Sequence, residues 1–448
     1  MVQFLRSHIR WVSLPILAAM LALMGVSLLS VRGAEQAAVR STAQAAGVAV
    51  AAGKPAPTVN PFVLGVTQKQ AKFCLVALAG FFVASVVPYE RIGRSSYLWF
   101  VLTLALLALV LFLPSNRNTQ RWINFGPLQF QPSELAKITF VMALAWYLRY
   151  RDTYRQWRGL IWPFVMMTVP AVLILKEPDL GTTLLLPPTL LLMLFMAGAR
   201  LRHLAVILGL AALAIFAPVP QRPDHIADRD VLADRQALAY WQGSFRGQEY
   251  LLVPGAVAAI GHHHQLIRIV GWLGQNDPSL SSDVSLQLRR SVMTIGSGGL
   301  LGHEQESDSD FVLNMLPEDH TDFILAVIGG KWGFLGCIGV LAIYLVIFVC
   351  GSEIAAMTYE PFGRLLAVGV LALLWTQIFI NAAMAMGLLP ITGMTLPLIS
   401  YGGSSMMING IALGLLVNVG RRPKAATGRK PFEFGRDETR SLGPLFDG

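Results

Sequence analysis

Apolar runs long enough to cross a lipid bilayer recur along the whole of this 448-residue chain. A transmembrane helix needs about 20 mostly apolar residues in a row. The chain is 54% hydrophobic and 14% charged, and no polar block in it is large enough to form a separate soluble catalytic domain. The sequence therefore predicts an all-α polytopic membrane protein.

The apolar runs predict ten transmembrane helices. They cover approximately residues 11–31, 70–88, 96–113, 134–148, 160–175, 181–197, 204–218, 323–349, 365–386 and 396–419. Arg6 and Arg10 precede the first run, which is longer than the apolar part of a signal peptide and has no clean cleavage site after it. We therefore expect this run to be a membrane span that enters from the cytoplasm.

Basic residues lie in short turns between spans, as the positive-inside rule predicts for cytoplasmic loops. The largest basic cluster is the turn at 149–158. Because ten is an even number, both termini then lie in the cytoplasm together with every basic turn. We expect a membrane domain over residues 1–420 and a basic cytoplasmic tail over 421–448. The net charge of +9 follows from this distribution, so we predict no nucleic-acid partner.

This topology places several polar segments outside the membrane. They cover residues 32–69, 114–132, 176–180, 219–322 and 388–396. The large external loop at 219–322 separates the seventh span from the eighth. Chemistry carried by these segments would face the cell exterior or the periplasm.

Two of the external segments have contrasting patterns. Residues 32–66 are small and show no clear periodicity, so we expect a loop without regular structure. Residues 264–273 have the apolar spacing of an amphipathic helix that lies in the membrane interface, with Arg268 on the polar face.

Polar residues near the starts of two spans are candidates for a site. Ser133 is expected to cap the fourth span, and Glu134 and Lys137 can meet because they are separated by three residues on one helix face. Asp179 can cap the sixth span. Trp122 fits an interfacial aromatic anchor on composition alone.

The stretch from Leu316 to Phe323 holds four ionisable side chains at the edge of an apolar span. Ionisable groups close to hydrocarbon indicate function. If the eighth span begins near Pro317, Glu318 and Asp322 lie near one face of the helix. Their mutual repulsion and partial burial would raise at least one pKa, which suits a general base or a site for a divalent cation.

Three other patterns argue against the sites that they superficially suggest. The three consecutive histidines at 262–264 point in different directions on any regular element, so we expect no metal there. The glycine-rich stretch 296–302 lacks the spacing of a dinucleotide loop and is expected to allow close backbone approach or to act as a hinge. Cys74, Cys337 and Cys350 are too dispersed for a disulfide framework or a zinc site.

Several blocks together resemble the SEDS family (shape, elongation, division and sporulation), of which RodA and FtsW are the type members. They occur in family order and cover most of the chain from the second span to the tenth. The matching blocks are Arg121–Ile123, Gln131–Glu134, Glu177–Thr182, Ile295–Gly299, Leu316–Phe323, Gly387–Gly393 and Leu396–Ser405.

The resemblance implies ten spans in the bacterial cytoplasmic membrane and a cavity open to the periplasmic side. It also implies peptidoglycan glycosyltransferase activity on lipid II and the growing glycan strand, with a class B penicillin-binding protein as transpeptidase partner. By this analogy Asp322 matches the essential family aspartate. Gly330 and Lys331 stand where two acids commonly follow it, which reverses the local charge.

We expect inverting glycosyl transfer with Asp322 as the catalytic base. Lys137, Arg121 and Arg268 are candidates for neutralising the pyrophosphate of the leaving group. A divalent cation, Mg²⁺ or Mn²⁺, held by Glu318 and Asp322 could share that task. The candidate substrate-binding residues are Trp122, Arg121, Glu134, Lys137, Asp179, Arg268, Glu318, His320 and Ser400.

Two other functions are compatible with the residues. A transporter that flips a lipid-linked precursor would also use the intramembrane Glu134 and Lys137 and the broken helices near Pro390 and Gly402. An inactive scaffold for a transpeptidase would fit Lys331. Within the family, the 364–386 span and the segment after it favour a RodA-like role in elongation over an FtsW-like role in division.

Overall fold

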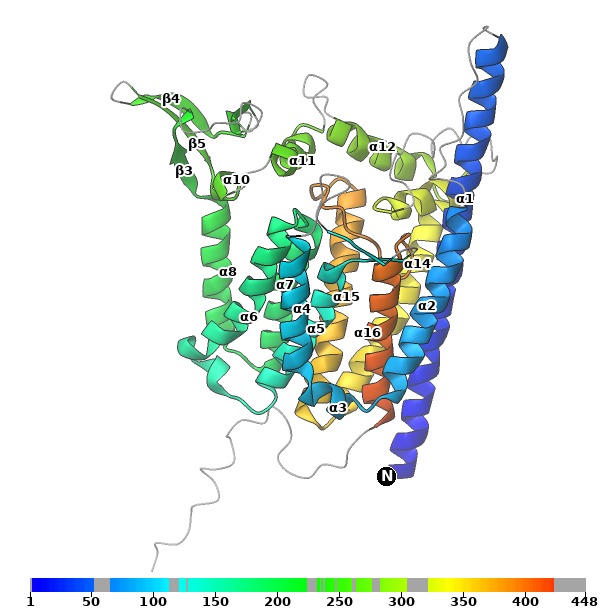
Figure 1. The fold of residues 1–448 in the computed structure, drawn as a ribbon, viewed down its shortest axis with the longest axis vertical. Helices are drawn as coiled ribbons and strands as arrows, with labels where there is room; N and C mark the ends of the chain where they lie inside the picture. The colour runs from blue at the N-terminus through cyan, green and yellow to red at the C-terminus, as the bar shows by residue number, and fades with distance from the viewer. Residues whose placement is uncertain are drawn as a thin grey trace, which may run out of the picture.

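The chain folds into a bundle of long, roughly parallel helices with a smaller layer of helices and strands across one end (Figure 1). The computed structural model describes residues 2–51, 65–112, 121–125, 128–223, 232–233, 235–236, 238–245, 248–259, 263–275, 283–303 and 321–422. We call the end of the bundle that carries this layer the outer end and the opposite end the inner end.

Each of the ten predicted spans coincides with a helix. These helices are α1 (Val2–Ala51), α2 (Val66–Val86), α4 (Ser96–Val110), α5 (Pro132–Leu148), α6 (Trp157–Lys176), α7 (Leu180–Ala197), α8 (Leu201–Phe216), α14 (Ile324–Met357), α15 (Pro361–Ala385) and α16 (Gly403–Arg421). The all-α polytopic class is therefore confirmed. At the inner end, a short helix α3 (Tyr89–Arg94) and a 3-10 turn η1 (Thr153–Arg155) connect neighbouring spans.

Seven of the described helices are long and apolar enough to cross a membrane, namely α1, α2, α6, α7, α14, α15 and α16. The helices α4 and α8 are apolar but have only 15 and 16 residues. Helix α5 has 17 residues and carries Glu134 and Lys137. The count of ten spans therefore stays a prediction.

The core of the bundle is built around α5, α15 and α16. In the apolar stretches of α15 and α16, 78% and 83% of the residues are buried, against 28% in α6. The outer helices α2, α6 and α8 expose large apolar side chains, as expected for surfaces that contact lipid. This arrangement holds the polar side chains of α5 inside the bundle.

The prediction of an irregular loop after the first span is wrong, because α1 continues to Ala51. The segment is rich in alanine, which has the highest helix propensity. Glu35 on this extension accepts hydrogen bonds from the backbone N–H groups of Gly65 (2.7 Å) and Thr67 (3.0 Å). It thereby provides an acceptor for N–H groups at the start of α2 that have no partner within the helix. The tenth span also differs, because residues 396–402 form turns and α16 begins only at Gly403.

The long external segment contains strands that the sequence did not predict. Strands β3 (Pro218–Gln221), β4 (Trp241–Phe245) and β5 (Gln248–Pro254) form an antiparallel sheet in the order β3-β5-β4, beyond the outer end of α8 (Figure 1). Val219 pairs with Val253, and Ser244 with Glu249. A second antiparallel pair, β1 (Ile123–Phe125) and β2 (Leu128–Phe130), precedes α5.

Between the sheet and α14, the described residues form three helices: α10 (Gly255–Ala259), α11 (His263–Leu273) and α12 (Asp283–Ser297). The predicted helix at 264–273 is thus confirmed as α11. Together with α12 it crosses the outer end of the bundle (Figure 1). These two helices place polar side chains above the ends of the spans.

The glycine-rich stretch after α12 packs against a break in α14. Gly333 has φ +65° and ψ −162°, a region that only glycine adopts readily. The carbonyl groups of Gly299 and Leu300 accept hydrogen bonds from Phe334 N–H (2.9 Å) and Leu335 N–H (3.1 Å). The predicted close backbone approach of residues 296–302 is confirmed. Two residues before the break, Lys331 places its ammonium group next to Gly33 of α1.

Candidate active site at the outer end of the bundle

Asp322 lies in a turn immediately before α14, at the outer end of the bundle. The prediction of a helix that begins near Pro317 is wrong at this point, because α14 begins at Ile324 and Asp322 is not helical. Threonine and aspartate favour turns since their side chains compete for backbone hydrogen bonds. Glu318 and His320 lie outside the described residues.

Asn381 of α15 fixes the backbone of Asp322. Its side-chain amide donates to the carbonyl oxygens of Asp322 (3.0 Å) and of Met394 (2.5 Å). This contact ties the turn before α14 to the loop between α15 and α16. No helical periodicity could have predicted it, because both acceptors lie outside helices, in a turn and in a loop.

Arg268 of α11 approaches Asp322 next to Gly393. A Cβ added to Gly393 would lie 3.6 Å from Oδ2 of Asp322 and 3.7 Å from Nη1 of Arg268, so glycine leaves room for both side chains. Burial lowers the pKa of the Arg268 guanidinium; Asp322 and Asp179 oppose this shift, and Arg121 adds to it. The Arg268 side chain, expected on the polar face of an interfacial helix, is half-buried near the Asp322 carboxylate.

Arg121 supplies a second cation from the segment before β1. Its Nε donates to the carbonyl oxygen of Glu177 (2.7 Å), and its Nη2 contacts that of Pro178. The Glu177 side chain is completely buried, and neither of its carboxylate oxygens has a hydrogen-bond partner among the described residues. Burial and the nearby Asp179 raise the pKa of this carboxyl to about 8, partly offset by Arg121.

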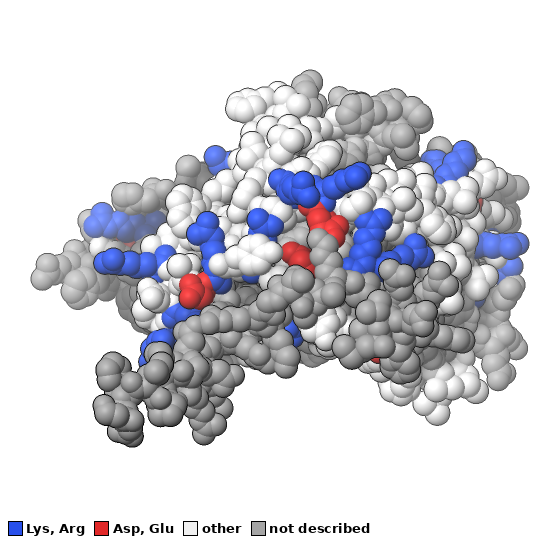
Figure 2. Space-filling model, turned by 90° about the horizontal axis from the view of Figure 1, so that it is seen from below, with Lys and Arg blue, Asp and Glu red and all other residues white. Residues whose placement is uncertain are grey.

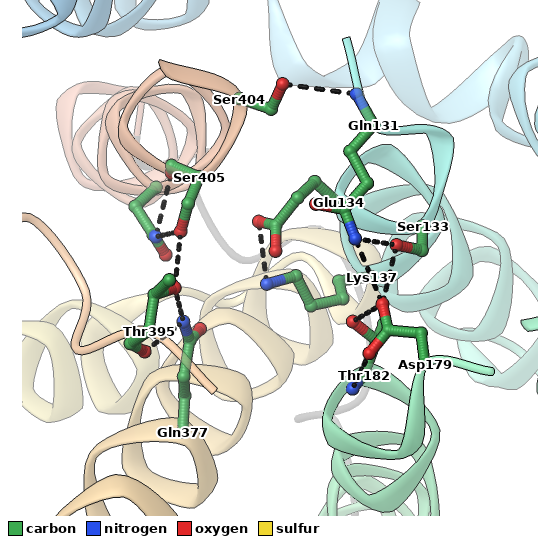
Figure 3. Close-up of polar contacts among 11 residues, drawn as sticks. Gln131, Ser133, Glu134, Lys137, Asp179, Thr182, Gln377, Thr395, Ser404 and Ser405 are labelled. Carbon is green, nitrogen blue, oxygen red and sulfur yellow. Dashed lines mark hydrogen bonds and ion pairs between the residues drawn. The ribbon is translucent and has the colours of Figure 1, made fainter. Parts of the chain in front are cut away.

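Asp179 caps α7, as predicted. Its carboxylate accepts hydrogen bonds from the Thr182 N–H (3.1 Å), the Thr182 hydroxyl (2.9 Å), the Ser133 hydroxyl (3.0 Å) and the Gln131 amide (3.0 Å) (Figure 3). The prediction that Ser133 caps α5 is wrong. Pro132 occupies the first helical position, where its fixed φ suits a helix start, and the Ser133 hydroxyl turns to Asp179 instead.

Glu134 and Lys137 form an ion pair inside the bundle, 2.8 Å from carboxylate to ammonium. Their predicted contact across one turn of α5 is confirmed. The pair lies between the Asp179 cluster and a second polar group on α15 and α16 (Figure 3). In that group, Gln377 donates to the carbonyl oxygen of Thr395 (2.9 Å), whose hydroxyl lies 2.9 Å from that of Ser405.

Two other predicted residues have clear structural positions. Trp122 is 42% exposed and precedes β1. Ser400 is buried in the turn before α16, and its hydroxyl accepts a hydrogen bond from the Leu396 N–H (2.7 Å). The structure thus brings Arg121, Arg268 and Asp322 into one electrostatic cluster, whereas Ser400 has a partner within its own turn. Substrate binding by these residues stays a prediction.

The described residues do not form a divalent-cation site by themselves. No group of three Asp, Glu, His or Cys side chains comes together in the described ranges. Asp322 faces a guanidinium, and a carboxylate in that position already has a cation beside it. The prediction of Mg²⁺ or Mn²⁺ depends on Glu318, which lies outside the described residues.

Comparison with a family model decides which family the chain belongs to. The FtsW, RodA and SpoVE model, described as "Cell cycle protein", matches residues 58–227 and 232–425. The chain belongs to this family. The SEDS resemblance of the sequence motifs is thereby confirmed, and so is the location in the bacterial inner membrane.

Individual relatives carry two names. The chain is 32% identical to the probable peptidoglycan glycosyltransferase FtsW of Geobacter metallireducens over 364 residues, which cover 80% of this chain and 85% of that protein. It is 28% identical to the peptidoglycan glycosyltransferase MrdB of Escherichia coli K12 over 337 residues, covering 75% and 80%. Relatives of both names match, so the preference for a RodA-like role stays a prediction.

Solved structures show the same fold. One chain of a peptidoglycan synthase complex aligns with a TM-score of 0.65 and 24% identity, covering 91% of this chain and 96% of that one. The crystal structure of the rod shape determining protein RodA of Thermus thermophilus aligns with a TM-score of 0.58 and 23% identity, covering 92% and 97%. These likenesses support the polytopic helical architecture of the SEDS member described here.

Proposed function

We propose that this chain is a peptidoglycan glycosyltransferase that polymerises lipid II at the outer face of the cytoplasmic membrane. The observation that carries the proposal is the meeting of Asp322 and Arg268 beside Gly393. A carboxylate and a guanidinium at the outer mouth of the bundle supply a base and a cation at one point. Two relatives named peptidoglycan glycosyltransferase support the reaction class.

The proposed step is an inverting transfer. The Asp322 carboxylate accepts the proton of the 4-hydroxyl of the acceptor sugar, and that oxygen forms a bond to the anomeric carbon of the growing strand. The bond from this carbon to the lipid pyrophosphate breaks, and the pyrophosphate leaves with the electron pair. A positioned general base contributes roughly 10²–10⁴-fold to the rate.

Arg268 and Arg121 are proposed to bind the pyrophosphate. Charge that develops on a leaving group is stabilised best by cations held in place before the reaction. Arg121 is held by two backbone carbonyl groups, and burial restricts Arg268. Both guanidinium groups lie close enough to influence each other, as expected for two cations that share one dianionic group.

We propose a class B penicillin-binding protein as the partner. The support is a structural neighbour that is part of a peptidoglycan synthase complex whose described activities are polymerisation and crosslinking. A transpeptidase would crosslink the strands that this chain polymerises, so the two activities act in succession on one product.

Polymerisation by purified protein tests the function. Wild type and Asp322→Ala are compared in detergent with lipid II and the partner, and glycan strands are resolved by gel electrophoresis. We expect strands from wild type and a loss of about 10²–10⁴-fold in rate from Asp322→Ala. The side chain is only half-buried, so the thermal unfolding temperature should stay close to that of wild type.

The matched control is Asp152→Asn, which removes an exposed carboxylate at the inner end and should leave the rate unchanged. Strands produced by folded Asp322→Ala at the wild-type rate would refute the role of Asp322. A wild type that makes no strands in detergent but moves lipid II across vesicles would favour a flippase. Complementation of a deletion by Asp322→Asn would favour an inactive scaffold.

A further inference from the structure

A basic cavity lies at the inner end of the bundle, far along the helices from Asp322. It has a volume of about 440 Å³ and is formed where the turn before α6 meets the start of α8. Its lining includes Arg155, Trp157, Arg200, Arg202, His203 and Val206, and no acidic residue contributes to it. Figure 2 shows this face of the molecule, where blue basic side chains are widespread.

The walls of the cavity are held by specific contacts. The Tyr154 hydroxyl donates to the carbonyl oxygen of Ala197 (2.7 Å), and Nε of Arg155 donates to that of Gly198 (3.3 Å). These bonds fasten η1 to the end of α7. On the other side, the rings of Trp157 and His203 are in contact, with their centroids 4.2 Å apart and their planes tilted by 37°. These contacts hold the walls of the cavity in place.

The cavity is lined by one buried polar atom without a partner among the described residues and by two exposed arginines. His203 is only 4% exposed, and its Nδ1 makes no hydrogen bond. The side chains of Arg200 and Arg202 also line the cavity and are exposed. A buried polar atom without a partner costs free energy, so His203 offers a hydrogen-bonding position to a ligand in the cavity.

Three other arginines at the inner end contact neighbouring groups of the protein. The guanidinium of Arg149 stacks on Trp146 at 3.2 Å, and that of Arg151 lies 4.5 Å from the ring centroid of Tyr147. Arg422 donates to the carbonyl oxygen of Val86 (2.5 Å). Placement of positive charge on the cytoplasmic side explains these residues, but it does not require arginines to gather around a cavity.

The ligand chemistry follows from charge and position. Three arginines favour a phosphate group, and no side chain caps the start of α8, where backbone N–H groups also attract anions. Val206 lines the cavity one turn into α8, and the large apolar side chains of that helix stay exposed beyond it. A ligand with a phosphate group and acyl chains would contact the basic cavity and the exposed apolar side chains of α8 at the same time.

We propose that this cavity binds the headgroup of an anionic phospholipid of the inner leaflet, with its acyl chains along α8. Basic pockets between transmembrane helices on the cytoplasmic side are suited to such headgroups. The phosphate accepts hydrogen bonds from the guanidinium groups of Arg200 and Arg202. The buried Nδ1 of His203 is a further polar contact for the headgroup. The site is separate from the proposed active site and does not depend on that function.

Binding of phosphatidylglycerol to the full chain in detergent tests the proposal, measured by native mass spectrometry. Wild type is compared with Arg200→Gln/Arg202→Gln and with the matched control Arg91→Gln/Arg94→Gln, which removes two exposed arginines of α3 at the same end. Loss of two interfacial arginines should weaken phosphatidylglycerol binding about 30-fold in the first variant. The control should bind as wild type does.

Further arms distinguish the source of the phosphate. Arg200→Lys/Arg202→Lys keeps the charge and should recover most of the affinity, whereas phosphatidylcholine should bind weakly to every variant. Inorganic phosphate at the same concentration should not displace the lipid, because it lacks acyl chains. Equal phosphatidylglycerol binding by both Gln variants would overturn the proposal, and displacement by inorganic phosphate would overturn the lipid as ligand. Unfolding temperatures of the lipid-free variants confirm that each is folded.

Discussion

The ion pair of Glu134 and Lys137 is buried inside the bundle, with exposed fractions of 7% and 1%. Removing one member of a buried pair leaves an uncompensated charge, at a cost of about 3–5 kcal/mol. We therefore expect Lys137→Met to lower the thermal unfolding temperature in detergent strongly. The double variant Glu134→Gln/Lys137→Met should have an unfolding temperature closer to that of wild type, because no unpaired charge remains buried.

Polymerisation by the double variant separates stability from substrate binding. If the pair contributes only to packing, the double variant should regain activity together with stability. We expect a folded but inactive protein, because Lys137 is a candidate cation for the substrate. Full activity in a stable double variant would contradict that role.

At the residue scale, contacts within one turn could be predicted and contacts between helices could not. The spacing of Glu134 and Lys137 predicts their meeting, and Asp179 precedes its helix in a way that predicts a cap. The contact of Asn381 with the Asp322 backbone joins positions 59 residues apart. It depends on how α14 and α15 pack, and periodicity carries no such information.

At the scale of elements, the break in α14 depends on Gly333. A Cβ at this position would lie 2.4 Å from the Gly302 nitrogen and 2.6 Å from the Leu300 carbonyl, and its φ of +65° disfavours any side chain. We expect Gly333→Ala to cost at least about 2 kcal/mol of stability. The matched control is Gly339→Ala in the same helix, where an added Cβ meets nothing within 4 Å.

Thermal unfolding of both variants in detergent measures the difference. Gly339→Ala should be neutral or stabilising by about 0.5–1 kcal/mol, since alanine is the better helix former. Equal unfolding temperatures for the two variants would show that the glycine-rich loop does not need the break.

The same element shows why sequence patterns predict span positions better than span ends. Apolar runs place α14 correctly, but the turn at Asp322 contacts α15 and the break at Gly333 contacts the glycine-rich loop after α12. In α1, alanine continues the helix beyond the apolar run, so hydropathy alone ends it too early. The strands of the external sheet are short and stabilise one another, and hydropathy at the span scale does not detect them.

At the scale of the whole molecule, the number of spans determines which side each loop occupies. With ten spans, residues 219–322 lie outside and the tail lies inside. If only the seven helices of sufficient length and apolarity crossed, α4, α5 and α8 would not, and the side of both segments would reverse. We expect ten, because only that count places Asp322 outside together with both termini and every basic turn inside.

Cysteine labelling in intact cells tests this count. Cys74, Cys337 and Cys350 are free thiols and are first replaced by alanine, after which Glu249→Cys on β5 or Ser441→Cys in the tail is introduced. A membrane-impermeant maleimide should label the exposed position 249 and leave position 441 unlabelled until the membrane is permeabilised. The reverse result would support seven spans and would place Asp322 on the cytoplasmic side, where a lipid-linked sugar presented at the outer face could not reach it.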